Sequence, residues 1–205
     1  MIRTAGSAKE FQTTQVPFKK FPGISAVADG AGAAVWAESH VAQVAASYPI
    51  HPARAMQEAF EDLAGQGSQN LWGQPLEVMR AESPQDAASI CEGYTLTGGR
   101  AVSFASGQAL PAMTETLRTI AGKRLPMVFH VGARALQSQA LATRTGHDDI
   151  LSVADCGWGI VFARDAQEVA DLALICRRAA EYAEAPFFVV QDAYATTHQI
   201  QDVLT

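Results

Sequence analysis

The sequence lacks the clustered cysteines and histidines from which local metal sites are built. Its three cysteines, Cys91, Cys156 and Cys176, lie far apart, and no CxxC or HxxxH pattern occurs among its 205 residues. Neither a zinc site nor an iron–sulfur cluster is therefore encoded locally. We expect each cysteine to be a small core residue in a reducing compartment, and we expect no metal on this chain.

Long apolar runs and basic tracts are also absent. No segment approaches the roughly 18 apolar residues of a membrane span, and the polar start of the sequence has no apolar core of a signal peptide. A formal net charge of -6, without a run of lysine or arginine, argues against a nucleic-acid surface. We therefore expect a cytoplasmic protein whose partners include neither a membrane nor a nucleic acid.

The composition that is present fits a globular domain. With 48% hydrophobic and 18% charged residues, the chain can bury a sizeable core. We expect an N-terminal arm over residues 1–23 that wraps a neighbour, and one domain over residues 24–205.

Apolar and helical stretches alternate along this domain. The patterns predict helices over 30–48, 52–67, 83–99, 107–123 and 166–184, and strands over 76–81, 100–106, 125–133, 159–165 and 185–192. Several of the strands lack polar alternation, which is typical of a parallel sheet buried on both faces. The predicted fold class is therefore α/β, a parallel sheet with helices on both faces. Ligands of such sheets lie beyond the carboxyl ends of the strands, so the loops there are the candidate site.

Six segments of the sequence carry a resemblance to a known family. They read YPIHP at 48–52, SFASGQAL at 103–110, GKRLPMVFHVGARAL at 122–136, GHDD at 146–149, VADLAL at 169–174 and TTHQIQ at 196–201. In this order they resemble the first domain of the 2-oxoacid:acceptor oxidoreductases, the pyruvate:ferredoxin oxidoreductase family. That family has YPITP, a TASQG-like turn, LPxVFHVxARAL, an HQD-like loop and TSHEIQ at the corresponding places. The resemblance implies the fold of a thiamine diphosphate-binding enzyme, specifically its pyrimidine-binding domain.

The resemblance also implies cofactors and partners. In the family this domain binds the aminopyrimidine half of thiamine diphosphate, while other domains or subunits hold the diphosphate, magnesium and iron–sulfur clusters. The reaction is oxidative decarboxylation of a 2-oxoacid, usually to an acyl-coenzyme A, with electrons passed to a ferredoxin-type acceptor. This chain lacks the family's GDG motif and cluster ligands. It is therefore expected to act with partner subunits, in a homo- or hetero-oligomer that it contacts through helices 30–48 and 107–122.

Two site residues of the family are carried over to Arg134 and His51. Arg134, in VGARAL, matches the arginine that holds the substrate carboxylate, and a guanidinium at the end of a buried strand suits bidentate capture of a carboxylate. The alternative is an arginine paired with a neighbouring acid. His51, in YPIHP, stands where the family has a threonine that contacts the substrate. The histidine either retunes substrate choice, blocks an unused pocket or caps the next helix.

Pro84 departs from the family at its catalytic acid. Ser83 and Pro84 predict a helix start, and an alignment without gaps from SFASGQAL places Pro84 on the glutamate that shares a proton with the pyrimidine nitrogen. Glu82 lies two residues earlier, and side chains at i and i+2 of an extended segment project to the same side. Glu82 is thus the candidate catalytic acid, although it reaches from about 6–7 Å further back. Otherwise it faces solvent or pairs with Arg80 or Arg54.

The remaining polar loop residues each allow two interpretations. Ser106 and Gln108, together with the Pro84 position, are candidate cofactor-binding residues, but FASGQ also suits a plain strand-to-helix connection. The acids and histidine of residues 147–149 are either an acid–base cluster or a loop held by bonds to its own backbone.

Two functional interpretations remain open on the sequence. The first is the substrate-carboxylate and pyrimidine-side half of a 2-oxoacid oxidoreductase, which Arg134 favours. The second is a degenerate, non-catalytic structural or assembly subunit of such a complex, which Pro84 and His51 favour. A third, an unrelated small-molecule-binding α/β domain, requires the match over residues 122–136 to be chance.

Overall fold

The centre of the molecule is a six-stranded sheet in which neighbouring strands run parallel, in the order β3-β2-β4-β5-β7-β6. The computed structural model describes residues 23–136 and 144–205, so the predicted arm lies outside the described residues apart from Gly23. The predicted α/β class with a parallel sheet is confirmed. The strands are β2 (Val44–Ser47), β3 (Glu77–Arg80), β4 (Ala101–Ala105), β5 (Val128–Ala133), β6 (Gly159–Ala163) and β7 (Phe187–Asp192).

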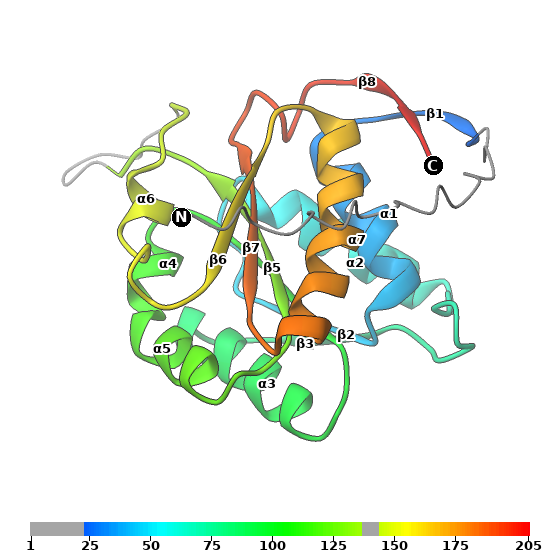
Figure 1. Cartoon of the computed structure of the whole chain (residues 1–205). Helices are drawn as coiled ribbons and strands as arrows, with labels where there is room; N and C mark the ends of the chain where they lie inside the picture. The colour runs from blue at the N-terminus through cyan, green and yellow to red at the C-terminus, as the bar shows by residue number, and fades with distance from the viewer. Residues whose placement is uncertain (1–22, 137–143) are drawn as a thin grey trace, which may run out of the picture.

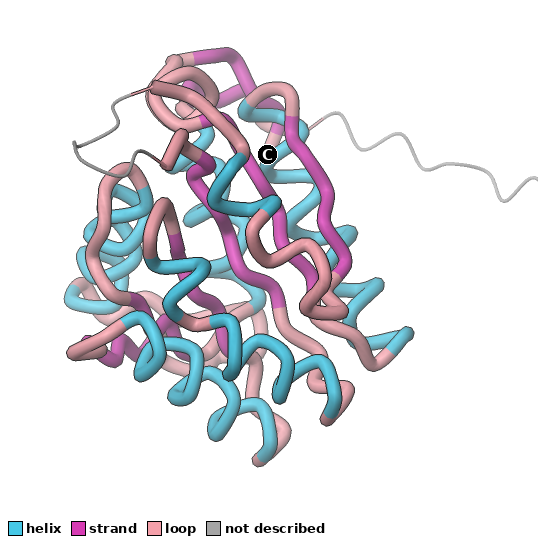
Figure 2. The backbone as a smooth tube through the Cα atoms, turned by 90° about the vertical axis from the view of Figure 1, so that its left-hand side faces the viewer, coloured by secondary structure: helices cyan, strands magenta, loops and turns pink. Residues whose placement is uncertain are grey.

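Helices cover both faces of the sheet (Figure 1). One face carries α1 (Gly30–Val41), α2 (Ala53–Gly65) and α7 (Ala166–Ala183), and the other carries α3 (Pro84–Leu96), α4 (Ala109–Ala112) and α5 (Thr114–Gly122). Figure 2 shows the strands side by side with helices in front of and behind them. Within residues 23–136 and 144–205, no helix combines the length and the apolar character that crossing a membrane requires.

The predicted helix over 30–48 is wrong beyond Val41. Residues 44–47 form β2, whose four residues are all buried between β3 and β4. Alanine favours helices, but pairing with two neighbouring strands outweighs that local preference. The correction matters for the site, because the YPIHP loop now follows a strand of the sheet rather than a helix.

The predicted helix over 107–123 is divided in two. It consists of the short α4 and the longer α5, which meet at Met113. Pro111 lies in α4, and proline has no N–H to donate to a longer helix. The predicted start of α3 is confirmed: the Ser83 side chain accepts a hydrogen bond from the Asp86 N–H at 3.1 Å, and Pro84 occupies the first turn.

Two short strands form a separate pair next to α7, and the sequence pattern does not predict them. β1 (Ser25–Ala28) and β8 (Gln201–Leu204) pair antiparallel, apart from the main sheet. The Gln167 side chain of α7 accepts a hydrogen bond from the Leu204 N–H at 2.6 Å and donates one to the Leu204 carbonyl at 3.1 Å. This pair therefore joins the beginning and the end of the described chain to the same helix.

A buried triad of polar side chains joins the sheet to the helices of one face. Glu38 of α1 lies 3.0 Å from Nε2 of His130 in β5, and its second oxygen lies 2.8 Å from Nη2 of Arg177 in α7. The Arg177 guanidinium also donates to the Ala101 carbonyl of β4 at 3.1 Å. The three side chains are at most 5% exposed. Helices α1 and α7 are rich in alanine, whose small side chain interlocks little with its neighbours. The directional contacts of the triad therefore specify the positions of the two helices on the sheet more narrowly than apolar packing alone.

The triad determines the protonation of Glu38. Burial is the largest influence and would raise its pKa, but the Arg177 charge and the hydrogen bond with His130 outweigh it and hold the pKa below its usual range. A carboxyl group whose pKa is lower in the native state than in the unfolded state stabilises the fold at neutral pH. That stabilisation begins to fall as the pH drops below about 4.3, the usual glutamate pKa, and is lost as it passes through the native value.

We predict that Glu38→Gln lowers the free energy of unfolding by about 3–5 kcal/mol at pH 7, because it leaves Arg177 buried without its counter-charge. Urea unfolding followed from pH 7 to pH 3 should show the difference from the wild type narrowing below about pH 4.3, where Glu38 of the unfolded state begins to take up a proton. Glu58→Gln is the control, since Glu58 is half-exposed and pairs with Arg54 on the surface. Equal losses from the two substitutions would contradict the prediction.

Candidate functional site

The loops that follow β2 and β4 lie at the point where the order of the strands reverses. From β2 the chain passes to β3 on one side, and from β4 it passes to β5 on the other. Such a switch point is where parallel sheets of this kind bind ligands. The buried Ser106 hydroxyl lies between the two loops and β5, at 3.1 Å from the His51 carbonyl and 2.8 Å from the Gly132 carbonyl. Ser106 therefore connects the loops to each other, and its predicted cofactor contact stays a prediction.

Arg134 is buried at the end of β5, where its side chain packs on Gly107. Only 3% of Arg134 is exposed, and its Nη2 donates to the Gln108 amide oxygen at 2.6 Å. Gly107 has a φ of +54°, and a Cβ there would lie 2.3 Å from Arg134 Nε. Glycine therefore suits this position on two grounds, its left-handed backbone conformation and the closeness of the guanidinium. Among the described residues no acid forms an ion pair with Arg134, unlike in the alternative considered from the sequence.

The Asp149 carboxylate joins three segments at this edge of the sheet. Its Oδ2 accepts hydrogen bonds from the N–H groups of Gly107 at 2.9 Å and Arg134 at 3.0 Å, and its Oδ1 accepts one from Ile150 at 2.8 Å. The residue is fully buried, at the start of α6 (Asp148–Leu151). Burial raises the pKa of Asp149, and the three backbone N–H bonds oppose that rise. Asp149 thus fixes the backbone on both sides of the Arg134 guanidinium.

His147 and Asp148, the other members of the predicted acid–base cluster, lie nearer the surface. His147 Nε2 is 2.7 Å from an Asp192 oxygen at the end of β7, and both side chains are about 40% exposed (42% and 41%). Asp148 accepts from the Leu136 N–H at 3.0 Å and is exposed. The carboxylates at 148 and 149 thus bind backbone N–H groups, most of them in other segments rather than in their own loop, so neither of the two interpretations describes these contacts in full. Asp192 is 45 residues from His147 in sequence, so the local pattern does not reveal it as a partner.

Glu82, the candidate catalytic acid, lies outside this group of residues. Its side chain is exposed and lines a hollow of about 550 Å³ at the end of β3, together with Asp86, Ser89 and Ile90 but neither Arg134 nor His51. Arg80 and Arg54 do not pair with it, because they bind glutamates of α2 at 2.7 and 2.6 Å.

Pro84 and His51 occupy the remaining predicted positions. Pro84 forms the first turn of α3 and is partly exposed, and it brings no acidic group to the site. The His51 side chain is exposed, and only its carbonyl has a described contact, the one with Ser106. The structure therefore brings together Arg134, Ser106 and Gln108, and leaves the side chains of Glu82 and His51 towards solvent.

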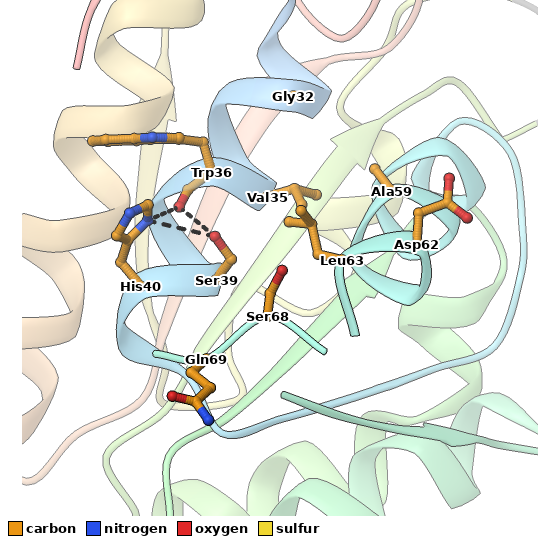
Figure 3. A pocket seen from close by; sticks show the side chains of 10 residues that line it. All are labelled: Gly32, Val35, Trp36, Ser39, His40, Ala59, Asp62, Leu63, Ser68 and Gln69. Carbon is orange, nitrogen blue, oxygen red and sulfur yellow. Dashed lines mark hydrogen bonds between the residues drawn. The ribbon is translucent and has the colours of Figure 1, made fainter. Parts of the chain in front are cut away.

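A further hollow of about 470 Å³ lies between α1 and α2, away from these loops (Figure 3). Val35 and Leu63 face each other across it. Its polar groups are already occupied on α1, because the Ser39 hydroxyl and His40 Nδ1 lie 2.8 and 2.7 Å from the Trp36 carbonyl. The buried guanidinium without an acidic partner among the described residues lies instead at the carboxyl edge of the sheet, so we place the candidate site there.

We predict that Asp149→Ala lowers the free energy of unfolding by about 3 kcal/mol or more, because it leaves three buried N–H groups without acceptors at roughly 1–3 kcal/mol each. Hydrogen exchange of the Gly107, Arg134 and Ile150 amides should accelerate in the same variant. Asp148→Ala is the matched neighbour and should cost less than about 1 kcal/mol, since its carboxylate is exposed. A loss no larger for residue 149 than for residue 148 would refute the role assigned to Asp149.

Comparison with known proteins identifies the family. The model of the family described as pyruvate flavodoxin/ferredoxin oxidoreductase, thiamine diphosphate-binding, matches residues 37–205. The chain is 35% identical over 175 residues to the pyruvate-flavodoxin oxidoreductase of Klebsiella pneumoniae, covering 85% of this chain and 15% of that protein. It is 34% identical over 175 residues to the pyruvate:ferredoxin oxidoreductase of Moorella thermoacetica, with the same coverage of 85% and 15%.

Among solved structures, the fold is similar to that of a 2-oxoglutarate:ferredoxin oxidoreductase from Magnetococcus marinus, determined with 2-oxoglutarate, coenzyme A and succinyl-CoA bound. The TM-score is 0.73 at 17% identity, over 88% of this chain and 31% of that one. The likeness supports the fold, and the sequence matches confirm the resemblance inferred from the motifs. The chain spans only a small part of the length of these relatives, and it belongs to the thiamine diphosphate-binding domain family of the pyruvate flavodoxin/ferredoxin oxidoreductases.

Proposed function

We propose that this chain contributes the carboxylate-binding half of a 2-oxoacid site within a larger 2-oxoacid:acceptor oxidoreductase. The observation that carries the proposal is the Arg134 guanidinium, which is buried at the carboxyl edge of the sheet and has no acidic partner among the described residues. A buried arginine without a counter-charge is costly unless a ligand supplies one. A 2-oxoacid carries a planar carboxylate that matches the guanidinium fork.

The pyrimidine side of a thiamine site fits the described residues less well. Activation of the cofactor requires an acid proton held at a ring nitrogen, and burial is what keeps a carboxyl group protonated near neutral pH. The two carboxylates around Pro84, those of Glu82 and Asp86, are both exposed. This stretch therefore does not fit the family's proton-transfer role, and we assign no proton transfer to Glu82.

The relatives suggest which partners complete such an enzyme. Their names specify pyruvate and 2-oxoglutarate as substrates and flavodoxin or ferredoxin as acceptors, and they are several times longer than this chain. We propose that other domains or subunits bind the diphosphate with magnesium, the iron–sulfur clusters and coenzyme A, and that the assembly is cytoplasmic. In this arrangement residues 24–205 form one pyrimidine-binding-type domain, and residues 1–23 are an arm that contacts a neighbour.

A second candidate function is favoured by Pro84 and His51. Pro84 and His51 stand at the positions of the family's catalytic acid and substrate-contacting threonine. If no other residue takes over these two roles, the chain is a degenerate subunit with a structural or assembly role. The exposed positions of Glu82 and His51 support this alternative. The two candidates differ in whether the assembled complex binds a 2-oxoacid at Arg134, so binding is the property to measure.

We predict that Arg134→Lys weakens 2-oxoacid binding by the assembled complex by about tenfold or more, because lysine keeps the charge but loses the two parallel hydrogen bonds. Isothermal titration calorimetry with pyruvate and with 2-oxoglutarate measures the effect. Arg178→Lys, on the exposed face of α7, is the control and should leave binding unchanged. Equal affinity of the wild type and Arg134→Lys would favour the degenerate subunit.

We predict that Pro84→Glu raises thiamine-dependent decarboxylation by the assembled complex at least about tenfold, since a positioned acid typically contributes far more than that. The first turn of α3 accepts glutamate, because a negative charge is favourable at a helix N-terminus. Pro84→Gln changes the backbone in the same way but adds no acid, and it should have no such effect. A wild-type complex that already works as fast as Pro84→Glu would show that another group supplies the proton.

A further inference from the structure

Gln108 is the one described side chain that hydrogen-bonds to the Arg134 guanidinium, whose buried Nε has no partner among the described residues. Its amide oxygen accepts from Arg134 Nη2 at 2.6 Å, which is short for a hydrogen bond to a neutral acceptor. Gln108 is exposed, whereas Arg134 is only 3% exposed. The glutamine side chain is therefore the outer member of the pair, at the boundary between the arginine and solvent.

The guanidinium lies close against the backbone of the loop after β4. It packs against Gly107, where even a methyl group in place of hydrogen would overlap with Arg134 Nε at 2.3 Å. The backbone N–H groups of Gly107 and Arg134 are both held by the same Asp149 oxygen. The accessible partner is the exposed Gln108 side chain, which has no other described hydrogen bond and lies just before α4.

The amide of Gln108 presents to Arg134 the kind of oxygen that a carboxylate presents. It offers a single neutral acceptor, whereas a carboxylate offers two oxygens and a negative charge, and such charge-assisted pairs are roughly twice as strong. We propose that Gln108 caps Arg134, and that a ligand carboxylate binds by displacing the glutamine amide and taking its place on the guanidinium. This inference rests on the proposed carboxylate-binding function of Arg134.

A cap of this kind lowers the apparent affinity for the ligand. The apparent affinity equals the intrinsic affinity multiplied by the fraction of molecules in which the Gln108 amide has already left the guanidinium. Removing the amide should therefore tighten binding, and replacing it with a resident carboxylate should prevent binding. Neither effect is expected of a glutamine that simply contacts the ligand, because its removal would weaken binding.

The test uses the assembled complex with 15N-labelled arginine in this chain alone, in which the Arg134 Nε resonance is assigned by its loss in Arg134→Lys. Pyruvate is the carboxylate probe, and its uncharged methyl ester is the control ligand. Relative to the wild type, Gln108→Ala should lower the midpoint of the pyruvate titration about tenfold, which is the effect of one hydrogen bond to a charged group. Gln108→Glu should raise the midpoint more than about tenfold. Gln66→Ala, an exposed glutamine at the end of α2, should change nothing.

The possible results separate the inference from the function on which it rests. A pyruvate midpoint that is equal in the wild type and Gln108→Ala, or weaker in Gln108→Ala, would overturn the cap while leaving carboxylate binding at Arg134 intact. If the Arg134 resonance does not respond to pyruvate in any variant, or responds equally to the methyl ester, the proposed function fails and the cap fails with it. Unfolding curves of the glutamine variants check that each remains folded under the conditions of the titration.

Discussion

The Asp149 carboxylate is the interaction on which the carboxyl edge of the sheet depends. By accepting the N–H groups of Gly107, Arg134 and Ile150, it sets the backbone after β4, the backbone after β5 and the first turn of α6 relative to one another. A carboxylate can be buried in this way because its hydrogen bonds replace those that it would make with water. The position of the guanidinium, its contact with Gly107 and its pairing with Gln108 all follow from that arrangement.

The order of strands and helices could be predicted largely from the sequence, because the buried strands form short apolar runs bounded by helix signals. The stretch VAAS at 44–47 could not, since four small residues after an alanine-rich helix carry no strand signal of their own. Only pairing with β3 and β4, which are distant in sequence, makes it a strand. The same holds for the triad of Glu38, His130 and Arg177, whose members are separated by 92 and 139 residues from Glu38.

The site was predictable as a region more than as a set of contacts. The motifs place Arg134, Ser106 and Gln108 at one edge of a parallel sheet, because residues at the carboxyl ends of parallel strands gather there. Which of them bind one another depends on side-chain directions that no spacing specifies. Glu82 illustrates the limit: the i, i+2 argument assumes that the strand continues, but β3 ends at Arg80, and the bend that follows turns the carboxylate outward.

The start of α3 shows that folding and chemistry impose separate demands on the same position. Ser83 caps the helix through its own hydroxyl, so the next residue only has to tolerate a first-turn conformation. Proline and glutamate both do so, the one through its fixed backbone angle and the other through its charge. An exchange between them is therefore nearly silent for stability while it removes or restores an acid. The folding stability of this domain therefore places almost no constraint on whether position 84 carries an acid.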